Sequence, residues 1–472
     1  MITPVTASKI FSVLGNNDSL VPMAIKDISN SVGLTAGSYI TGQAAEGQDR
    51  FIDEFGTQAI WLFGIPAYKK LLDLTMFKSS GFDSGVDVRI LKDKEVFELA
   101  KQYAKKHDEL FKNNIKVPKI AKSLEHVSAK QKAFKGLTFG KFAISTLMTI
   151  FTYSGLTKFR QKYREEKIKK EFLEKHSAQK TFTSNLHKPN MTDFMGKKTN
   201  PAFTGSLQDF MFSPVKNLMI VDASISGERL LKSKNKQELT MYAIKEGSFW
   251  FFMYFAGAQI KKLLEKHSLK KHNIPIDIDP RAIESEELKN ALLNNKVLQS
   301  INEFPAEKNL SNADIYRFVN ENQENLIVKM AKKSDIVKTV KVRNGLFKKS
   351  VDTGSIDNRK FIDPNDIISL KDKLKVLYDK GQEFIQSKAK NMGKKVEELS
   401  ADDIQKLLGN YLETVKKGTR KATLKNIGAC IGFLGVIMPA TLIAWRFFGK
   451  GNKEYQVRTD VENKLKSQMN LI

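Results

Sequence analysis

The segment Ile427–Trp445 constrains the fold more than any other part of the chain, because it runs for nineteen residues without a charged side chain. A helix of this length reaches roughly 30 Å, about the thickness of the hydrocarbon layer of a bilayer. Lys425 precedes the run and Arg446 follows it. Basic residues at both ends are typical of a span anchored among headgroups, and the alternative is a helix buried in a soluble core. The sequence therefore predicts an integral membrane protein with an embedded segment at about 427–446.

Three further apolar segments predict additional embedded helices, at about 55–70, 137–157 and 247–261. The segment at 137–157 is long enough to span a bilayer if Lys141 extends to the membrane surface. The other two are shorter than the roughly 20 residues that a span requires. We expect these two to be tilted, re-entrant or interfacial helices, or else to pack inside a soluble bundle. Together the four segments predict a multi-pass protein of the cell membrane.

The balance of charged residues predicts an anionic partner. The chain of 472 residues has 78 Lys and Arg residues against 52 Asp and Glu residues, a formal net charge of +26. Such an excess favours a polyanionic neighbour, and we expect this to be the lipid bilayer with its anionic headgroups. Protein partners are also expected. Nucleic acid is less favoured because no groove-reading module appears, and the remaining alternative is a set of solvated lysine-rich helix faces.

A strongly basic stretch directly follows the segment at 137–157 and is the predicted surface for membrane headgroups. Each Lys or Arg beside an anionic leaflet contributes about 1 kcal/mol to binding. The predicted membrane-surface residues are Lys158, Arg160, Lys162, Arg164, Lys167, Lys169 and Lys170.

Matches between two parts of the chain predict an internal duplication. The stretch that begins at Glu54 aligns with the stretch that begins at Glu246, an offset of 192 residues, and at this offset the motif KKLL at 69–72 matches 261–264. Further along, the offset settles at 288. Repeats commonly place a functional surface at their mutual interface.

The duplication predicts a division of the chain into two repeat units and attached segments. We expect a first repeat unit at 1–160, a basic linker at 161–202, a second repeat unit at 203–448 and a polar tail at 449–472. The second unit carries an inserted helical module at 266–369.

Two pairs of glycines predict close packing between the two longest apolar helices. Gly136 and Gly140 are four residues apart, as are Gly428 and Gly432, and the offset of 288 aligns Gly140 with Gly428. Small residues at this spacing let membrane helices approach one another.

Elsewhere the patterns predict basic amphipathic helices that face water. Ser311–Asp314 and Ser400–Asp403 have the form of capping boxes that open helices. Further amphipathic helices are expected at 90–113, 284–303 and 366–387. Alternating residues on both sides of Asn344-Gly345 predict a small β-hairpin.

No catalytic motif is present in the sequence. There is no phosphate-binding loop, zinc-protease motif, nucleophile elbow or dinucleotide fingerprint. His267 and His272 suit a basic surface better than a metal site, and Asp277 and Asp279 suit an edge strand or turn. The one cysteine, Cys430, lies in the last apolar run, which excludes intramolecular disulfides. We therefore predict no catalytic, cofactor-binding or metal-binding residues.

These patterns predict a mainly α-helical membrane protein that is not an enzyme. The expected role is that of a scaffold, tether or assembly component that binds an anionic surface through basic loops. The alternative is a small neutral-solute transporter or pore at the repeat interface, lined by hydroxyls such as those of Thr146, Thr149, Thr152 and Tyr153. A weaker alternative is a membrane-anchored nucleic-acid binder.

Overall fold

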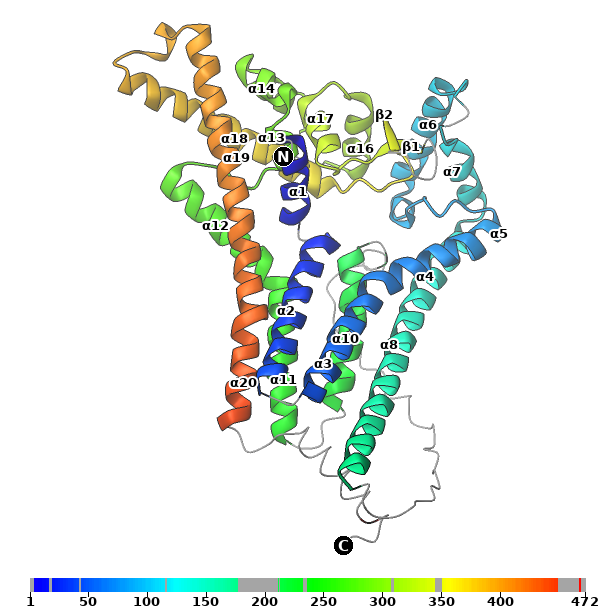
Figure 1. Cartoon of the computed structure of the whole chain (residues 1–472). Coiled ribbons are helices and arrows are strands. Elements are labelled where there is room, and N and C mark those ends of the chain that lie inside the picture. Colours follow the sequence, from blue (N-terminus) through cyan, green and yellow to red (C-terminus); the bar gives the residue numbers. More distant parts are fainter. Residues whose placement is uncertain are drawn as a thin grey trace. The chain divides into compact units, whose positions relative to one another are not determined.

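The computed structural model is mainly helical, with one two-stranded sheet in the part of the chain that it describes (Figure 1). The mainly α fold predicted from the sequence is therefore confirmed. The described residues are 4–16, 19–41, 44–114, 117–176, 211, 213–231, 236–306, 310–343, 350–448 and 467. The predicted linker beyond residue 176 and the predicted tail, except for residue 467, lie outside the described residues.

The chain divides into two compact units. The large unit consists of Met1–Ile25, Ala67–Ile144 and Phe251–Cys430, and the helical bundle consists of Lys26–Pro66, Ser145–Trp250 and Ile431–Ile472. Each unit takes segments from both predicted repeats. Compactness therefore divides the chain differently from the alignment, and the repeat units at 1–160 and 203–448 remain a prediction.

The helical bundle draws three described helical stretches from each half of the chain (Figure 1). From the first half come α2 (Leu20–Thr41, from Lys26 onward), α3 (Ala44–Ala59) with the π-helical turn η1 (Ile60–Gly64), and the part of α8 (Gln131–His176) from Ser145 onward. From the second half come α10 (Pro214–Leu231), α11 (Lys236–Trp250), and the π-helical turn η6 (Phe433–Ile437) with α20 (Met438–Phe448).

Contacts along the bundle show the directions of its helices. The Gln58 side chain on α3 donates a hydrogen bond to Ser31 on α2, at 2.7 Å, within an antiparallel pair. Thr146 on α8 donates to Asn217 near the start of α10, at 3.3 Å. Closer to the end of α8, Arg160 is connected to Ser226 by a series of polar contacts through α3 and α11. Ser226 lies closer to the end of α10 than Asn217 does. α8 and α10 therefore run in the same direction.

The large unit holds the remaining elements, most of them short helices. Its helices before residue 145 are α1 (Pro4–Gly15), α4 (Ile65–Leu72), the π turn η2 (Asp73–Phe77), α5 (Lys78–Ser80), the 3₁₀ turn η3 (Val88–Leu91), α6 (Lys94–Leu110) and α7 (Ile120–Ala129). After the π turn η4 (Phe251–Phe255) come α12 (Ala256–His272), α13 (Pro280–Ile283), α14 (Glu286–Leu293), α15 (Lys296–Asn302), α16 (Asn312–Glu321), α17 (Leu326–Lys333), α18 (Pro364–Asn391), η5 (Val396–Glu398) and α19 (Ala401–Gly432).

Local signals in the sequence explain where several of these helices begin and end. Ser311 caps α16 and forms a reciprocal capping box with Asp314, as predicted. Ser400 and Asp403 exchange the same two backbone contacts at the start of α19. The predicted helix at 284–303 is instead two helices, α14 and α15, because Asn295 between them adopts a left-handed conformation with φ of 54°. A left-handed residue ends a helix because it cannot continue the right-handed spiral.

The predicted hairpin is present as β1 (Thr339–Arg343) paired antiparallel with β2 (Ser350–Ile356). Val342 lies opposite Val351, and the register shifts between Thr339 and Lys341. The predicted turn at Asn344-Gly345 lies outside the described residues.

Three Asp-x-Arg turns stabilise the loops of the large unit. In each, the aspartate accepts a hydrogen bond from the arginine backbone amide and binds the guanidinium through both carboxylate oxygens, and the pairs are Asp87–Arg89, Asp279–Arg281 and Asp357–Arg359. Arg359 also binds Asp83 at 2.9 Å, and its carbonyl accepts the Asp87 amide. Forked contacts of this kind are among the stronger hydrogen bonds in proteins, so they fix the 83–91 loop against 357–359.

One helical stretch among the described residues, Ala401–Ala444, is long and apolar enough to cross a membrane. It contains most of the predicted segment at 427–446. A core helix of a soluble protein passes the same test, but such a helix is mostly buried, whereas 28% of the most apolar window is buried here. The segments at 55–70, 137–157 and 247–261 lie in described helices that do not pass this test. Multi-pass embedding is therefore not established and is treated below as a proposal.

Candidate functional site

The helical bundle buries charged side chains among apolar ones and exposes large apolar side chains. The buried charged side chains in its described part are Lys26, Asp27, Asp53, Glu54, Asp222, Lys245 and Glu246. They share the interior with buried apolar residues such as Trp61, Leu218, Val221 and Leu434. Large apolar side chains that are exposed on the same helices include Ile28, Val32, Phe51, Phe63, Phe151, Val436 and Ile437. In a soluble helical bundle, charged residues are mostly exposed and the outward helix faces are mostly polar.

A network of ion pairs connects the two halves of the chain inside the bundle. The Lys245 ammonium on α11 lies 3.5 Å from the Glu54 carboxylate on α3. Arg50, one turn before Glu54, lies 3.6 Å from the same carboxylate. The neighbouring Asp53 forms an ion pair with Arg160 on α8. Three helices are therefore joined through two adjacent carboxylates, which offsets much of the cost of burying each charge.

A second group of polar contacts continues the network across α10 and α11. The Ser226 hydroxyl donates a hydrogen bond to Glu246 at 2.7 Å, and the Trp250 indole donates to the Ser226 oxygen at 3.1 Å. Glu246 directly follows Lys245, so both branches of the network start from one turn of α11. Glu54 and Glu246 are the residues that the offset of 192 aligns, and they lie in this same interior.

Uncharged polar groups line the interior beside the ion pairs. Ser31, Gln58 and Asn217 are buried there, and each forms a side-chain hydrogen bond to another helix. Within the described part of the bundle, four buried polar atoms of uncharged side chains have no hydrogen-bond partner: Asn30 Oδ1, Thr35 Oγ1, Thr57 Oγ1 and Asn217 Nδ2. An unpaired buried polar atom costs about 1–3 kcal/mol, so these positions call for an additional partner such as water or a polar ligand.

The hydroxyls predicted to line a polar path fall into two groups. Thr146, Thr149 and Tyr153 are buried in the bundle. Thr149 is bonded to the Ser145 carbonyl of its own helix at 2.8 Å. Thr152 is exposed and donates to the Met148 carbonyl at 2.7 Å. The structure therefore brings three of the four hydroxyls into the polar interior.

Close helix packing in the bundle occurs at glycines other than the predicted ones. A Cβ atom on Gly33 of α2 would lie 2.2 Å from the Gly435 carbonyl oxygen of η6. In contrast, no described atom lies within 4 Å of such a Cβ on Gly136, Gly428 or Gly432, and on Gly140 it would meet only the end of the Met76 side chain, at 3.8 Å. The packing role of Gly136, Gly140, Gly428 and Gly432 therefore stays a prediction. The distinguishing feature of Gly33 is its position opposite a backbone carbonyl, which spacing along the sequence does not show.

The seven predicted membrane-surface residues do not form one uniform face. Lys158, Lys162, Lys169 and Lys170 are exposed on α8, and Lys162 lies 3.8 Å from Glu166. Arg160 is the exception, because it points into the bundle toward Asp53. Lys167 is half-buried and bonded to Gln48, and the side chain of Arg164 lies outside the described residues.

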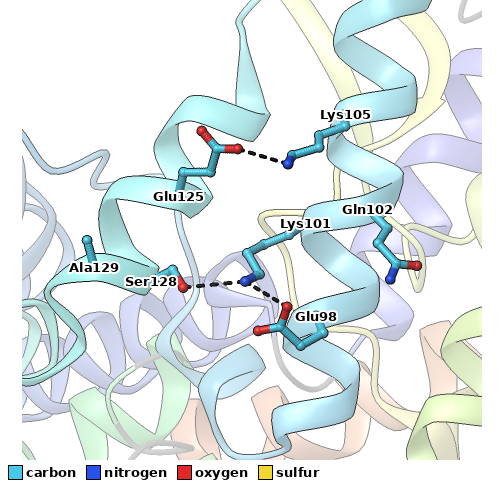
Figure 2. Close-up of a pocket in the computed structure, with 7 residues that line it drawn as sticks. All are labelled: Glu98, Lys101, Gln102, Lys105, Glu125, Ser128 and Ala129. Atoms are coloured by element: carbon cyan, nitrogen blue, oxygen red, sulfur yellow. Dashed lines mark hydrogen bonds and ion pairs between the residues drawn. The ribbon is translucent and has the colours of Figure 1, made fainter.

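A polar groove in the large unit, between α6 and α7, has a volume of about 350 Å³ (Figure 2). Lys105 lies 3.2 Å from Glu125, and Lys101 contacts both Glu98, at 2.7 Å, and Ser128, at 3.4 Å. Figure 2 shows that Lys101 and Lys105 reach from α6 toward Ser128 and Glu125 on α7. The charges of the groove are therefore paired within its wall.

The described residues contain no group of three His, Cys, Asp or Glu side chains that could hold a metal ion. Asp279 caps α13, so its role is that of a turn residue. Comparison of the chain with protein-family models, with curated proteins and with solved structures finds no match.

Proposed function

We propose that this chain is a non-enzymatic membrane protein whose helical bundle lies in the bilayer and which acts as a scaffold or tether. The observation that carries the proposal is the combination of buried ion pairs inside the bundle with exposed Phe63, Phe151 and Val436 on its outside. Lipid accepts apolar side chains, whereas charged groups within a membrane face the protein interior and pair with one another.

The basic face at the end of α8 supports the tether role. Lys162, Lys169 and Lys170 are exposed there and follow directly from the bundle part of the same helix. Lysines in this position meet an anionic surface without changing the bundle, because their side chains leave the helix toward solvent. The proposed partner is an anionic lipid surface.

A vesicle-capture assay tests this role. Proteoliposomes of neutral lipid that carry the chain should capture free vesicles containing phosphatidylserine and leave pure phosphatidylcholine vesicles unbound. Replacing Lys162, Lys169 and Lys170 by Gln should weaken capture at least about tenfold, since each lysine contributes about 1 kcal/mol at such a surface. The matched control replaces three exposed lysines of α12, Lys266, Lys270 and Lys271. Equal capture of both vesicle types, or unchanged capture by the α8 variant, would contradict the proposal.

The directions of the helices set a condition on the proposal. Because α8 and α10 run in the same direction, Lys169 near the end of α8 and Pro214 at the start of α10 lie toward opposite ends of the bundle. Single cysteines placed at Lys169 and Pro214, with Cys430 replaced by Ser, should therefore be labelled from opposite sides of sealed vesicles.

We further propose that the two halves of the chain arose by duplication. The π-helical turns η1 and η4 occupy 60–64 and 251–255, which differ by 191 residues, close to the offset of 192. The helices before them carry the aligned Glu54 and Glu246, and α2 and α10 precede these helices in the same order. Superposition of α2–α3 on α10–α11 with one rotation and translation is the expected result.

A second candidate function is passage of a small polar solute through the bundle. It is favoured by the unpartnered Asn30 Oδ1, Thr35 Oγ1 and Asn217 Nδ2. Glycerol flux into proteoliposomes, which should fall in an Asn217→Leu variant, separates this function from the tether, for which flux equals that of empty vesicles.

A further inference from the structure

A cavity of about 320 Å³ lies in the large unit, between α12, the 273–279 loop and the first half of α18. Its wall has two chemical sides. Glu265, Asp277 and Lys373 form a charged side, and Leu269, Ile368 and Val376 form an apolar side. A volume of this size lies at the lower end of the roughly 300–1,000 Å³ of small-molecule sites.

Asp277 is held by two lysines. Lys261 Nζ lies 2.5 Å from one of its carboxylate oxygens, and Lys373 Nζ lies 2.8 Å from the other. Burial alone would raise the pKa of Asp277, but the two ammonium groups outweigh burial and lower it. Asp277 therefore stays ionised, and both lysines are already engaged by a carboxylate, which leaves them poorly placed to recruit an anion.

Glu265 differs from Asp277 in having no hydrogen bond or ion pair within the described residues. Burial raises the pKa of the Glu265 carboxyl, and the nearby negative charge of Asp277 raises it further. Lys373 and Lys261 act in the opposite direction but do not outweigh these two effects.

A cation bound beside Glu265 would stabilise the ionised carboxylate. It would compensate for the water lost on burial and for the negative charge of Asp277. The third carboxylate of the wall, Asp372, lies 3.4 Å from Lys371. The described residues form no group of three His, Cys, Asp or Glu side chains that could hold a metal ion, so an organic cation fits the cavity better.

We propose that this cavity binds a small organic ammonium ion, with the charged nitrogen against Glu265 and an aliphatic body against Leu269, Ile368 and Val376. This inference is independent of the role proposed for the helical bundle. The two sides of the cavity match the two ends of such a ligand, and a volume of about 320 Å³ suits an alkyl chain of a few carbons.

Calorimetric titration of the purified full-length protein with n-butylammonium chloride tests the inference. We expect saturable binding at neutral pH in the millimolar range or tighter, and no binding of butyrate or n-butanol, which share the aliphatic body. Glu265→Gln should weaken binding at least about tenfold, which corresponds to about 1.4 kcal/mol. Glu397→Gln, an exposed glutamate elsewhere in the large unit, is the matched control and should bind as the unaltered protein does.

The dependence on pH gives a second readout. Binding should weaken as the pH falls through the raised pKa of Glu265, and the Glu265→Gln variant should lose this dependence. Circular dichroism of both variants checks that they are folded. Absence of n-butylammonium binding, equal binding of n-butanol, or unchanged affinity in a folded Glu265→Gln variant would overturn the inference.

Discussion

The Lys245 ammonium and the Glu54 carboxylate lie 3.5 Å apart, and both side chains are buried. They come from opposite halves of the chain. Glu54 is the position that the proposed duplication aligns with Glu246, the residue directly after Lys245. The pair therefore links α3 to α11, one helix from each half of the chain.

Replacement of Lys245 by Met should destabilise the bundle. The variant leaves Glu54 with the half-buried Arg50 as its remaining cation, and removing one partner of a buried ion pair costs about 3–5 kcal/mol. Thermal unfolding in detergent measures the loss. Adding Glu54→Gln to Lys245→Met should restore part of the stability, whereas the exposed Lys262→Met should be neutral. An unchanged unfolding temperature for Lys245→Met would show that the pair does not stabilise the bundle.

Replacement by alanine should lower the stability of the protein at Gly33 and raise it at Gly428. A Cβ on Gly33 would lie 2.2 Å from the Gly435 carbonyl oxygen and 2.8 Å from Pro439, so α2 and η6 would have to separate, at a cost of about 1–3 kcal/mol. Gly428→Ala meets no described atom within 4 Å and should gain up to about 1 kcal/mol from helix propensity. The comparison of both melting temperatures tests which glycines lie at the packed interface, and destabilisation by Gly428→Ala would restore the role predicted from the sequence.

The contact between Asp83 and Arg359 should make the large unit sensitive to acid. Burial would raise the pKa of Asp83, but Arg359 and a hydrogen bond from the Gly85 amide outweigh it and lower this pKa. A carboxyl with a lowered pKa in the folded state contributes stability above its unfolded pKa of about 3.9 and loses it as the pH falls through the folded pKa. Asp83→Asn should therefore reduce the free energy of unfolding at neutral pH. It should also make this free energy depend less on pH in the acidic range.

Urea unfolding between neutral and strongly acidic pH measures this effect. The exposed Asp379→Asn is the matched control and should leave both the stability and its pH dependence unchanged. If the free energy of unfolding of Asp83→Asn depended on acidic pH as that of the unaltered protein does, the contact between Asp83 and Arg359 would not contribute to stability.

Local features of the fold were predictable, and features that depend on distant parts of the chain were not. The capping boxes at Ser311 and Ser400 and the hairpin around 339–356 follow from short sequence patterns, because the interacting atoms lie within a few residues of one another. The helix break at Asn295 was missed because the apolar pattern continues through it. The left-handed backbone conformation of this asparagine does not change the spacing of the apolar residues around it.

The polar interior of the bundle was missed for a different reason. Asp53, Glu54 and Lys245 lie at the edges of apolar segments, where charged residues are expected to meet water. Their burial depends on partners about 107 and 191 residues away, Arg160 for Asp53 and Lys245 for Glu54. The acidic positions Glu54 and Glu246, which the offset of 192 aligns, were a usable signal, because an acidic residue at the same place in two similar apolar segments favours a role inside the protein.

The account depends most on the claim that the apolar exterior of the bundle faces lipid, and two arginine substitutions test it directly. Val436 lies at the centre of Ile427–Trp445 and is 66% exposed, and Val351 on β2 of the large unit is 55% exposed. An arginine at the centre of a membrane span costs about 2.5–3.5 kcal/mol on insertion scales, whereas an arginine on a surface in water costs little. Resistance of the membrane-bound chain to alkaline extraction measures insertion. We predict that Val436→Arg lowers the inserted fraction and that Val351→Arg leaves it unchanged. Equal, unaltered behaviour of both variants would show that Val436 faces water and would contradict the account.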